Sequence, residues 1–511
     1  MPCTMGDLVL RCIEYGGDNA ALVSGDERIS YSRMGELLSR MIPALREQGI
    51  RRGTGFACLS SNRFEAFLLM AAAYLMGARI TNLHPLGSAE DHRYIIENSE
   101  AEVLVFDPEF HGERVRKILS LSGDKVKVVA LGESDIAPDL LADMRGRPPA
   151  GLKSEAAPDD ICFIVYTGGT TGRPKGVVHT HETHLALTMA KLAEWEFADR
   201  PRFLVTTPIS HGAGLCILPA LLKGGTVHFS KGFDAAGFVD TVNRHRIDST
   251  FMVPTMIYKL LDHLRVTGRR CETLSCVVYG AAPMSPARMT EALDLMGPVF
   301  MQLYGQSEAP NCVTVLRKAD HDPVNHPGRI ASCGRPIHLS QVRLLNDDGV
   351  PVAPGEVGEI CVRGPLVMTG YWKNESETRK AIRDGWLRTG DLARKDADGF
   401  LYIVGRSKDL IISGGFNVYP AEVEDTLTAH PAVSAAAVIG VPHPQWGEAV
   451  HAVVVLRPGH MATAEELCAC VRQAKGPVYA PKTLEFRDGL PLTALGKPDK
   501  KALRNEHIES R

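Results

Sequence analysis

A short glycine- and threonine-rich segment constrains the fold of this chain more than any other feature. Residues 161–166 (ICFIVY) form an apolar, β-rich run that enters residues 167–176 (TGGTTGRPKG), and residues 177–179 then read as a strand that leaves them. This pattern predicts a strand–loop–strand unit. Because 511 residues exceed the size at which one hydrophobic core usually stops growing, we expect this unit to belong to one of two or more domains.

The loop within this unit has the chemistry of a phosphate site. Glycines let backbone N–H groups approach an anion, threonine hydroxyls add neutral donors, and Arg173 and Lys175 offset negative charge. Pro174 precedes Lys175 where a Walker A loop requires glycine, so the P-loop NTPase interpretation fails. A flexible glycine-rich connection is the alternative. The predicted phosphate-binding residues are Thr167, Gly168, Gly169, Thr170, Thr171, Gly172 and Lys175, with Thr170 also assigned to catalysis.

The rest of the chain predicts a mixed α/β protein. Up to about residue 334, short apolar strands such as 54–59, 103–106, 226–229, 249–253 and 276–279 alternate with helical stretches, which indicates two α/β subdomains. The apolar run 66–78 is shorter than the roughly 20 residues that span a bilayer, so we expect a buried helix there. Residues 334–405 have short strands separated by turns, which predicts a small β-barrel-like subdomain. A small α+β domain should follow, so the expected division is 1–404 and 405–511.

Composition argues for small-molecule partners. The 57 Lys and Arg residues against 60 Asp and Glu residues, a net charge of −3, give no sign of a nucleic-acid surface or a basic membrane anchor. The twelve cysteines lack paired zinc-site spacing, and the N-terminus shows no secretory signal, so we expect free thiols in a reducing cytoplasm and no membrane span. A homodimer is possible.

Six motifs in order give the chain its family resemblance. They are the loop above, 304–308 (YGQSE), 370–373 (GYWK), 384–391 (DGWLRTGD), 405–409 (GRSKD) and 496–497 (GK). In these residues the chain resembles the adenylate-forming superfamily of acyl- and aryl-CoA ligases, luciferases and peptide-synthetase adenylation domains, and is most like the acyl- or aryl-CoA ligases. The resemblance spans nearly the whole chain. It implies a large N-terminal domain of two α/β subdomains and a small β-barrel-like subdomain, followed by a small mobile C-terminal domain.

The resemblance also implies nucleotide contacts. The ring of Tyr304 should stack on adenine, Ser307 should donate to the α-phosphate, and Glu308 should hold Mg²⁺ and act in catalysis. Asp391 should accept from both ribose hydroxyls, and Arg406 should contact ribose or phosphate. The adenine should also lie along a strand end made of the small residues Gly280, Ala281 and Ala282, for which packing is the alternative explanation. Gly305, the glycine of the YGQSE motif, should contact the nucleotide as well.

The C-terminal domain should serve two half-reactions. Lys497 is the predicted late cation, which stabilises negative charge while a carboxylate attacks the α-phosphate. Lys408 is the hinge by position, and Gly414 and Gly415 should let the pantetheine arm pass close to the backbone after the domain swings. For Lys497 the alternative is a solvated basic patch, and for Gly414 and Gly415 it is a plain turn.

The acid site is expected around His211, a predicted catalytic residue in 210–214 (SHGAG). His211 stands where peptide-synthetase domains carry an Asp for an amino group, so α-amino acids are unfavoured. The small residues 212–214, 281 and 282 suggest room for an aromatic or extended acyl group.

The resemblance therefore implies an enzyme that uses ATP and Mg²⁺ to make an acyl-adenylate from a carboxylic acid, releases pyrophosphate, and passes the acyl group to coenzyme A. A ligase with an amine or carrier-protein thiol as acceptor shares every motif. A nucleotide-binding regulator is a third reading, against which Glu308, Asp391 and Lys497 argue.

Overall fold

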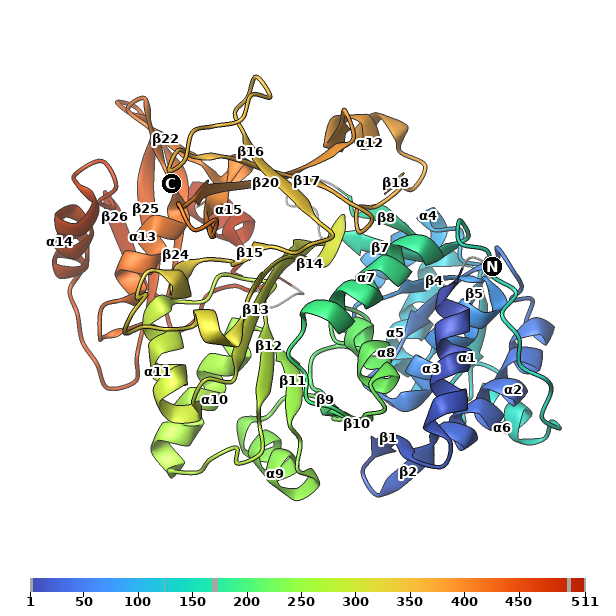
Figure 1. The fold of residues 1–511 in the computed structure, drawn as a ribbon. Coiled ribbons are helices and arrows are strands. Elements are labelled where there is room, and N and C mark those ends of the chain that lie inside the picture. The colour runs from blue at the N-terminus through green and yellow to red at the C-terminus, as the bar shows by residue number, and fades with distance from the viewer. Residues whose placement is uncertain (1–2, 124, 168–172, 494–497, 510–511) are drawn as a thin grey trace.

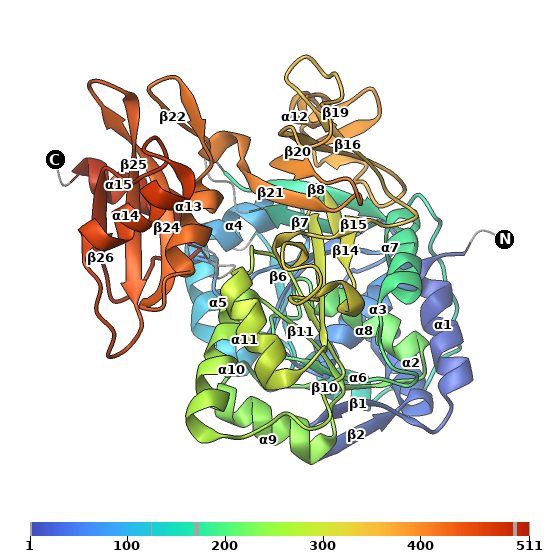
Figure 2. The same cartoon turned by 60° about the vertical axis from the view of Figure 1, so that its left-hand side comes forward.

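A computed structural model describes residues 3–123, 125–167, 173–493 and 498–509. It has the expected mixed α/β architecture, with a large N-terminal part and a small C-terminal unit (orange to red) at one end of the molecule (Figures 1 and 2). In both views the C-terminal unit lies next to helix α11 (Pro286–Met296).

The first sheet carries the predicted phosphate loop. It has seven strands in the order β18-β8-β7-β4-β3-β5-β6, parallel from β7 to β6 and antiparallel at β7–β8 and β8–β18. The strands are β3 (Gly55–Leu59), β4 (Arg79–Asn82), β5 (Val103–Phe106), β6 (Lys127–Ala130), β7 (Ile161–Thr167), β8 (Lys175–Thr180) and β18 (Gly370–Tyr371). The helices in this stretch of chain are α1 (Met5–Gly16), α2 (Tyr31–Glu47), α3 (Phe64–Met76), α4 (Ala89–Asn98), α5 (Pro108–Ser122) and α6 (Leu140–Arg145).

Helix α3 is the buried helix expected from the apolar run. Twelve of its thirteen residues are buried, and Gly77 ends it with a left-handed φ of 66°. No described helix is both long and apolar enough to cross a membrane.

The second sheet combines distant parts of the chain. Its nine strands have the order β15-β14-β13-β12-β11-β9-β10-β1-β2, so the N-terminal hairpin β1–β2 extends it through parallel pairing of β1 with β10. The strands are β1 (Ala20–Ser24), β2 (Glu27–Ser30), β9 (Arg202–Val205), β10 (Thr226–Phe229), β11 (Ser249–Met252), β12 (Cys276–Tyr279), β13 (Phe300–Gln306), β14 (Ala309–Leu316) and β15 (Arg335–Pro336). The accompanying helices are α7 (His181–Glu194), α8 (Gly214–Leu222), α9 (Ala235–His245), α10 (Pro254–Thr267) and α11.

Two smaller sheets complete the molecule. The turn-rich stretch forms five strands with antiparallel pairing, and the C-terminal unit forms another five-stranded sheet covered by helices. The first set is β16 (Gln341–Leu345), β17 (Gly358–Arg363), α12 (Glu375–Ala381), β19 (Ile382–Arg383), β20 (Trp386–Lys395) and β21 (Leu401–Arg406). The second set is β22 (Ile411–Ser413), β23 (Phe416–Val418), α13 (Pro420–Thr428), β24 (Val433–His443), β25 (Gly447–Leu456), α14 (Ala464–Lys475), β26 (Thr483–Phe486) and α15 (Lys500–Glu509).

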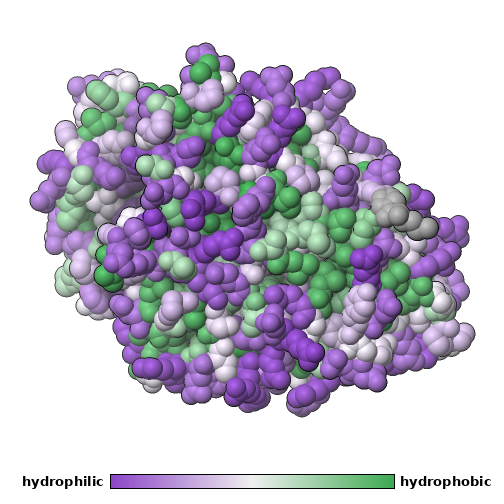
Figure 3. Space-filling view, in the orientation of Figure 1, coloured by the Kyte–Doolittle hydropathy of each residue, from purple (hydrophilic) through white to green (hydrophobic). Residues whose placement is uncertain are grey.

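The outer surface has no single dominant character in the view of Figure 3. Hydrophilic side chains cover most of this face, and apolar side chains gather near its centre. This mixture agrees with the near balance of charges in the sequence.

Candidate active site

The hairpin of β7 and β8 brackets the predicted phosphate loop. Thr167 and Lys175 are directly paired across it, so the two residues expected to flank the phosphate lie opposite each other. Gly168, Gly169, Thr170, Thr171 and Gly172 lie outside the described residues, and their roles stay predictions.

Lys175 has a protein partner in place. Its ammonium pairs with the carboxylate of Glu377 in α12 and lies 5.0 Å from the ring centre of Tyr371. Hydrogen bonds from Lys175 and Lys380 hold the pKa of Glu377 at about 2. A phosphate that reaches Lys175 must therefore compete with Glu377 for the lysine ammonium.

The YGQSE motif occupies the end of β13 and the turn into β14. Tyr304 and Gly305 directly precede Gln306, the last residue of β13, and Ser307 and Glu308 form the turn. The Nε2 of buried His179, on β8, donates to the carbonyl oxygen of Ser307 at 2.8 Å. This bond fixes the motif against the strand that leaves the phosphate loop.

Glu308 is held from both its side chain and its backbone. The hydroxyl of Tyr371 donates to Glu308 Oε1 at 2.7 Å, and the backbone N–H of Met368 donates to the Glu308 carbonyl at 2.8 Å. Mg²⁺ is usually bound by one or two carboxylates together with substrate phosphates, and an oriented single carboxylate fits that role. The described residues contain no cluster of three or more His, Cys, Asp or Glu side chains suited to a metal.

Asp391 links the same motif to the end of the N-terminal part. The hydroxyl of Tyr304 donates to Asp391 Oδ2 at 2.7 Å, and Arg406 Nε donates to Asp391 Oδ1 at 2.9 Å across the β20–β21 pair. Asp391 is only 5% exposed. Tyr304 is likewise buried, and burial beside Asp391 raises the pKa of its phenol. Tyr304, Asp391 and Arg406 thus form one hydrogen-bonded group.

The strand end at Gly280 is shaped by packing. A Cβ at Gly280 would lie 2.5 Å from the carbonyl oxygen of Leu303, so the neighbouring strand alone requires glycine there. Ala281 has a left-handed φ of 69°, a conformation that costs energy for a residue with a side chain and that concentrates at functional sites. Ala282 follows in the same bend.

His211, the predicted residue of the acid site, lies just before α8. Its Nδ1 is 2.8 Å from the hydroxyl of Ser210, and its ring packs edge-on against His84 with centroids 4.7 Å apart. The backbone N–H of Leu86 donates to His84 Nδ1, so His84 carries its proton on Nε2. Burial lowers the pKa of His211 to about 3 and that of His84 to about 4. Both rings are therefore neutral hydrogen-bonding groups at pH 7.

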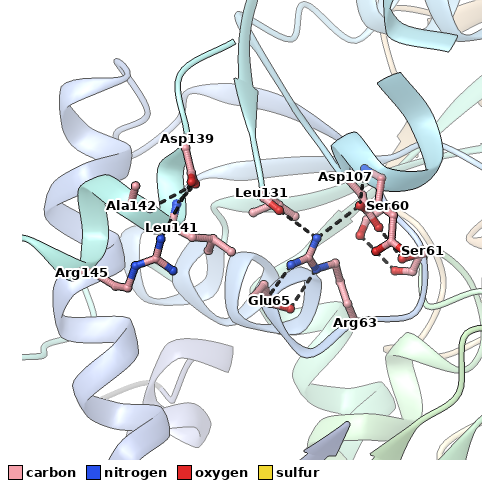
Figure 4. Close-up of polar contacts among 11 residues, drawn as sticks. Ser60, Ser61, Arg63, Glu65, Asp107, Leu131, Asp139, Leu141, Ala142 and Arg145 are labelled. Carbon is pink, nitrogen blue, oxygen red and sulfur yellow. Dashed lines mark hydrogen bonds and ion pairs between the residues drawn. The ribbon is translucent and has the colours of Figure 1, made fainter. Parts of the chain in front are cut away.

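A buried amide positions the loop before His211. Asn62 accepts from the backbone N–H of Ile209 at 2.8 Å and donates to the carbonyl of Thr207 at 3.1 Å. The next residue along the chain, Arg63, is fixed by two carboxylates: Figure 4 shows its guanidinium between Glu65 and Asp107. The first sheet thus holds the loop that carries His211.

The small residues after His211 have structural reasons. A Cβ at Gly214 would lie 2.0 Å from the carbonyl oxygen of Ile209, and one at Gly212 would lie 3.3 Å from the ring of Phe251. Ala213 is fully buried. Packing alone therefore explains why these positions carry small residues, whether or not they also leave room for the acyl group.

Three of the residues predicted for the C-terminal domain, Lys408, Gly414 and Gly415, lie at the start of the small unit. Lys408 is in a single 3₁₀ turn, Ser407–Asp409, and lines a cleft with Glu448 and Arg504. Gly414 and Gly415 have φ of 59° and 83° at the tip of the β22–β23 hairpin, a turn that favours glycine by itself. Lys497 lies outside the described residues, so its role stays a prediction.

Three functional candidates are not assigned from sequence: Asn62, His84 and Tyr371. Tyr371 stood inside the quoted GYWK motif, which was a usable signal. The others come from segments without a motif, and only the fold brings them to the site.

Two family models match the chain. Residues 11–372 match the model described as AMP-binding enzyme, and residues 422–497 match the model of the AMP-binding enzyme C-terminal domain.

Named relatives cover nearly the whole chain. The medium/long-chain-fatty-acid–CoA ligase FadD8 of Mycobacterium tuberculosis is 42% identical over 98% of this chain and 90% of its own length. A feruloyl-CoA synthase of an Amycolatopsis species is 38% identical over 96% of this chain and 97% of its own. Among solved structures, the amide bond synthetase McbA from Marinactinospora thermotolerans has a TM-score of 0.90 at 32% identity, covering 98% of this chain and 99% of its own.

Proposed function

Because the chain belongs to the family of AMP-binding enzymes and is an AMP-forming acid–thiol ligase that uses ATP, Mg²⁺ and coenzyme A, we propose that its acid is an apolar aryl or alkyl carboxylate. In the first half-reaction the carboxylate attacks the α-phosphorus of ATP and pyrophosphate leaves. In the second, the thiol of coenzyme A attacks the acyl carbon and AMP leaves.

Each group that is held in place on the nucleotide side has one proposed task. Mg²⁺, when bound, neutralises phosphate charge, and Glu308 would hold it with the carboxylate that Tyr371 orients. Asp391, fixed by Tyr304 and Arg406, offers acceptor oxygens to the ribose hydroxyls. Lys497 supplies the cation for the attack on phosphorus. Lys408 is the hinge for the domain swing, after which Gly414 and Gly415 flank the pantetheine arm.

The single observation that carries the acid class is the pair of neutral imidazoles on the acid side. His211 and His84 lie in contact with pKa values lowered by burial, and neither forms an ion pair with a carboxylate among the described residues. A neutral imidazole can donate to a carboxylate but cannot balance the charge of an α-ammonium group. An unpaired ammonium in such a place costs several kcal/mol.

The test is a screen for pyrophosphate release with saturating Mg²⁺-ATP, run with matched acids such as phenylpropionate and phenylalanine. We expect the apolar acid to be at least about tenfold better by kcat/KM. A preference for the amino acid in such pairs would move the substrate to the peptide-synthetase class.

The acceptor needs a separate measurement because McbA, named an amide bond synthetase, has a closely similar fold. Each acid that supports pyrophosphate release is incubated with coenzyme A, with simple amines, or with neither. Rapid thioester formation with coenzyme A, and slow or no amide formation, is the expected outcome. Efficient amide formation without thioester would replace the acceptor.

We infer the cellular compartment from the state of the cysteines. All twelve cysteines are free thiols, as expected in a reducing compartment. The cytoplasm is therefore the proposed location.

A further inference from the structure

The C-terminal unit has a hydrophobic interior of its own. The buried residues of its two clusters run from Ile411 to Leu503, whereas those of the cluster formed with the preceding five-stranded sheet reach only to Leu401. Each hydrophobic cluster of the described residues therefore lies wholly before or wholly after Lys408, the proposed hinge. Because none of these clusters joins the two parts, their relative orientation depends on smaller contacts between them.

An ion pair crosses the proposed hinge. Arg394, on β20, pairs with the carboxylate of Glu422, in the first turn of α13. Helix α13 also packs against β21, the strand that leads into the hinge. Other cations of the unit pair inside it, such as Lys500, whose ammonium lies 2.7 Å from Glu424. The Arg394–Glu422 pair instead ties the unit to the sheet before the hinge.

A second charged region faces the unit but adds little attraction. In Figures 1 and 2 the unit lies next to α11, and the charges of four side chains on α10 and α11 act on Arg457, which follows β25. Burial and the guanidinium groups of Arg288 and Arg265 lower the pKa of Arg457. The two carboxylates, Asp262 and Glu291, each pair with both of these arginines. Their charge is therefore balanced without Arg457.

Glu422 has a second cation on its own side of the hinge. The Nζ of Lys475, in α14, lies 3.9 Å from Glu422 Oε2. The side chain of Glu422 is 13% exposed and that of Arg394 is 44% exposed. When the pair separates, Lys475 still offsets the charge of the carboxylate, and water can solvate Arg394. Opening therefore leaves no buried charge without a partner, so the contact can form and break in each catalytic cycle.

We propose that Arg394 and Glu422 are positioning residues that hold the C-terminal unit in the orientation of this structure. A contact present in only one of two domain orientations stabilises that orientation alone. It therefore favours the half-reaction that this orientation serves and opposes the other. The inference rests on the proposed function, because the swing about Lys408 supplies the second orientation, and it adds the contact that sets the balance between the two.

The experiment measures the two half-reactions of the full-length enzyme separately, as pyrophosphate release from acid and ATP and as thioester formation from a supplied acyl-adenylate and coenzyme A. Arg394→Gln and Glu422→Gln should each change the ratio of the two rates by about two- to fivefold, in the same direction, the scale of one exposed ion pair. In the double variant the effects should not add, because either substitution alone breaks the pair. Arg394→Lys keeps the charge and should stay closer to the wild type than Arg394→Gln.

Salt supplies a readout that a merely structural role would not move. Raising the salt concentration from about 0.01 M to about 1 M shortens the Debye length from about 30 Å to about 3 Å. With all substrates saturating, the wild-type ratio should move toward that of Arg394→Gln, whose own ratio should change less. Arg487→Gln is the matched control, because it breaks ion pairs with Glu485 and Glu506 that lie entirely after the hinge. Its ratio should equal that of the wild type.

Each of three results would overturn the inference: an unchanged ratio in the two single variants, additive effects in the double variant, or the same change in Arg487→Gln as in Arg394→Gln. Thermal unfolding of each variant separates these outcomes from a loss of the fold. If the wild type catalyses neither half-reaction with any acid, the proposed function fails instead, so the two failures are distinguishable.

Discussion

On the nucleotide side of the candidate site, two carboxylates are each held by a phenol hydroxyl, whereas on the acid side two imidazoles lie against each other without a carboxylate partner among the described residues. Tyr371 orients Glu308 and Tyr304 orients Asp391, both at 2.7 Å. His84 and His211 instead share a buried ring contact. The nucleotide side therefore carries fixed negative charge, whereas the two imidazoles of the acid side are neutral.

This difference follows from what each side must bind. Carboxylates can hold a cation and accept from ribose hydroxyls, and rigid partners prevent them from turning toward other groups. A substrate carboxylate would be repelled by such charges. Neutral donors at low exposure leave it free to approach phosphorus.

The largest expected effect comes from removing the fixed charge at Glu308. Glu308→Gln keeps the shape and the acceptor for Tyr371 but loses the negative charge that Mg²⁺ needs. We expect kcat for pyrophosphate release to fall by about 10²- to 10³-fold, the scale of losing one charge-stabilising group. Tyr371→Phe, which only frees the carboxylate, is the matched control and should lose much less. Equal losses in the two variants would show that orientation, not charge, matters.

Asp391→Asn should act on nucleotide binding. An amide has one acceptor oxygen, so either Tyr304 or Arg406 loses its partner, and hydrogen bonds to a charged group contribute about 1.5–3 kcal/mol. We expect the KM for ATP to rise about 10- to 100-fold, with a smaller change in kcat. Steady-state kinetics with varied ATP measures both. A change in kcat alone would contradict the ribose role.

The hinge prediction tests whether the C-terminal domain must swing between the two half-reactions. Lys408→Pro fixes φ in the short 3₁₀ turn and should obstruct the domain swing while leaving the ATP site intact. Thioester formation from a supplied acyl-adenylate should slow by about tenfold or more, with adenylation largely kept. Lys408→Ala, which leaves φ free, is the control. Equal loss of both rates in a folded protein would exclude the hinge.

On the acid side, Asn62→Ala should cost both stability and acid selectivity. It leaves the Ile209 N–H and the Thr207 carbonyl buried without partners, at about 1–3 kcal/mol in free energy of unfolding. The loop that carries His211 then loses its support, so kcat/KM for the acid should fall several-fold while the KM for ATP stays constant. Asn62→Gln keeps both the amide acceptor and the amide donor and should be milder. A parallel rise in the KM for ATP would show a general loss of structure.

The sequence allowed several elements of the fold to be predicted, while the roles of the nucleotide residues stay predictions. Tyr304, Asp391 and Arg406 form one hydrogen-bonded group, Glu308 is bound separately by Tyr371, and the apolar patterns predicted β5, β10, β12 and α3 to within a few residues. Local periodicity is sufficient for such elements because it depends on neighbours in the chain.

The acid side depended on contacts that local patterns do not contain. His84 and His211 are 127 positions apart, so no local pattern could bring their rings together. The parallel pairing of β1 with β10 was likewise hidden, because it joins residues 22 and 227. Gly214 shows another limit of local patterns: its smallness suggests space for a substrate, but the nearby carbonyl of Ile209 is a sufficient reason for glycine there.

The smallest expected effect is on the pH dependence of acid binding, and it tests the neutrality of the acid side directly. An ordinary imidazole, with a pKa near 6.5, would become cationic between pH 7.5 and 5.5 and attract the substrate carboxylate, so the KM for the acid would fall. Burial lowers the pKa of His211 to about 3 and that of His84 to about 4, so both stay neutral throughout this range. We therefore expect the KM for an acid that is fully ionised over this range to change by less than about twofold from pH 8 to 5.5, when measured by pyrophosphate release at saturating Mg²⁺-ATP. The exposed His460→Gln variant should give the same profile. A KM that falls about tenfold on acidification would mean that an imidazolium binds the carboxylate, and the contrast between a charged nucleotide side and a neutral acid side would then be wrong.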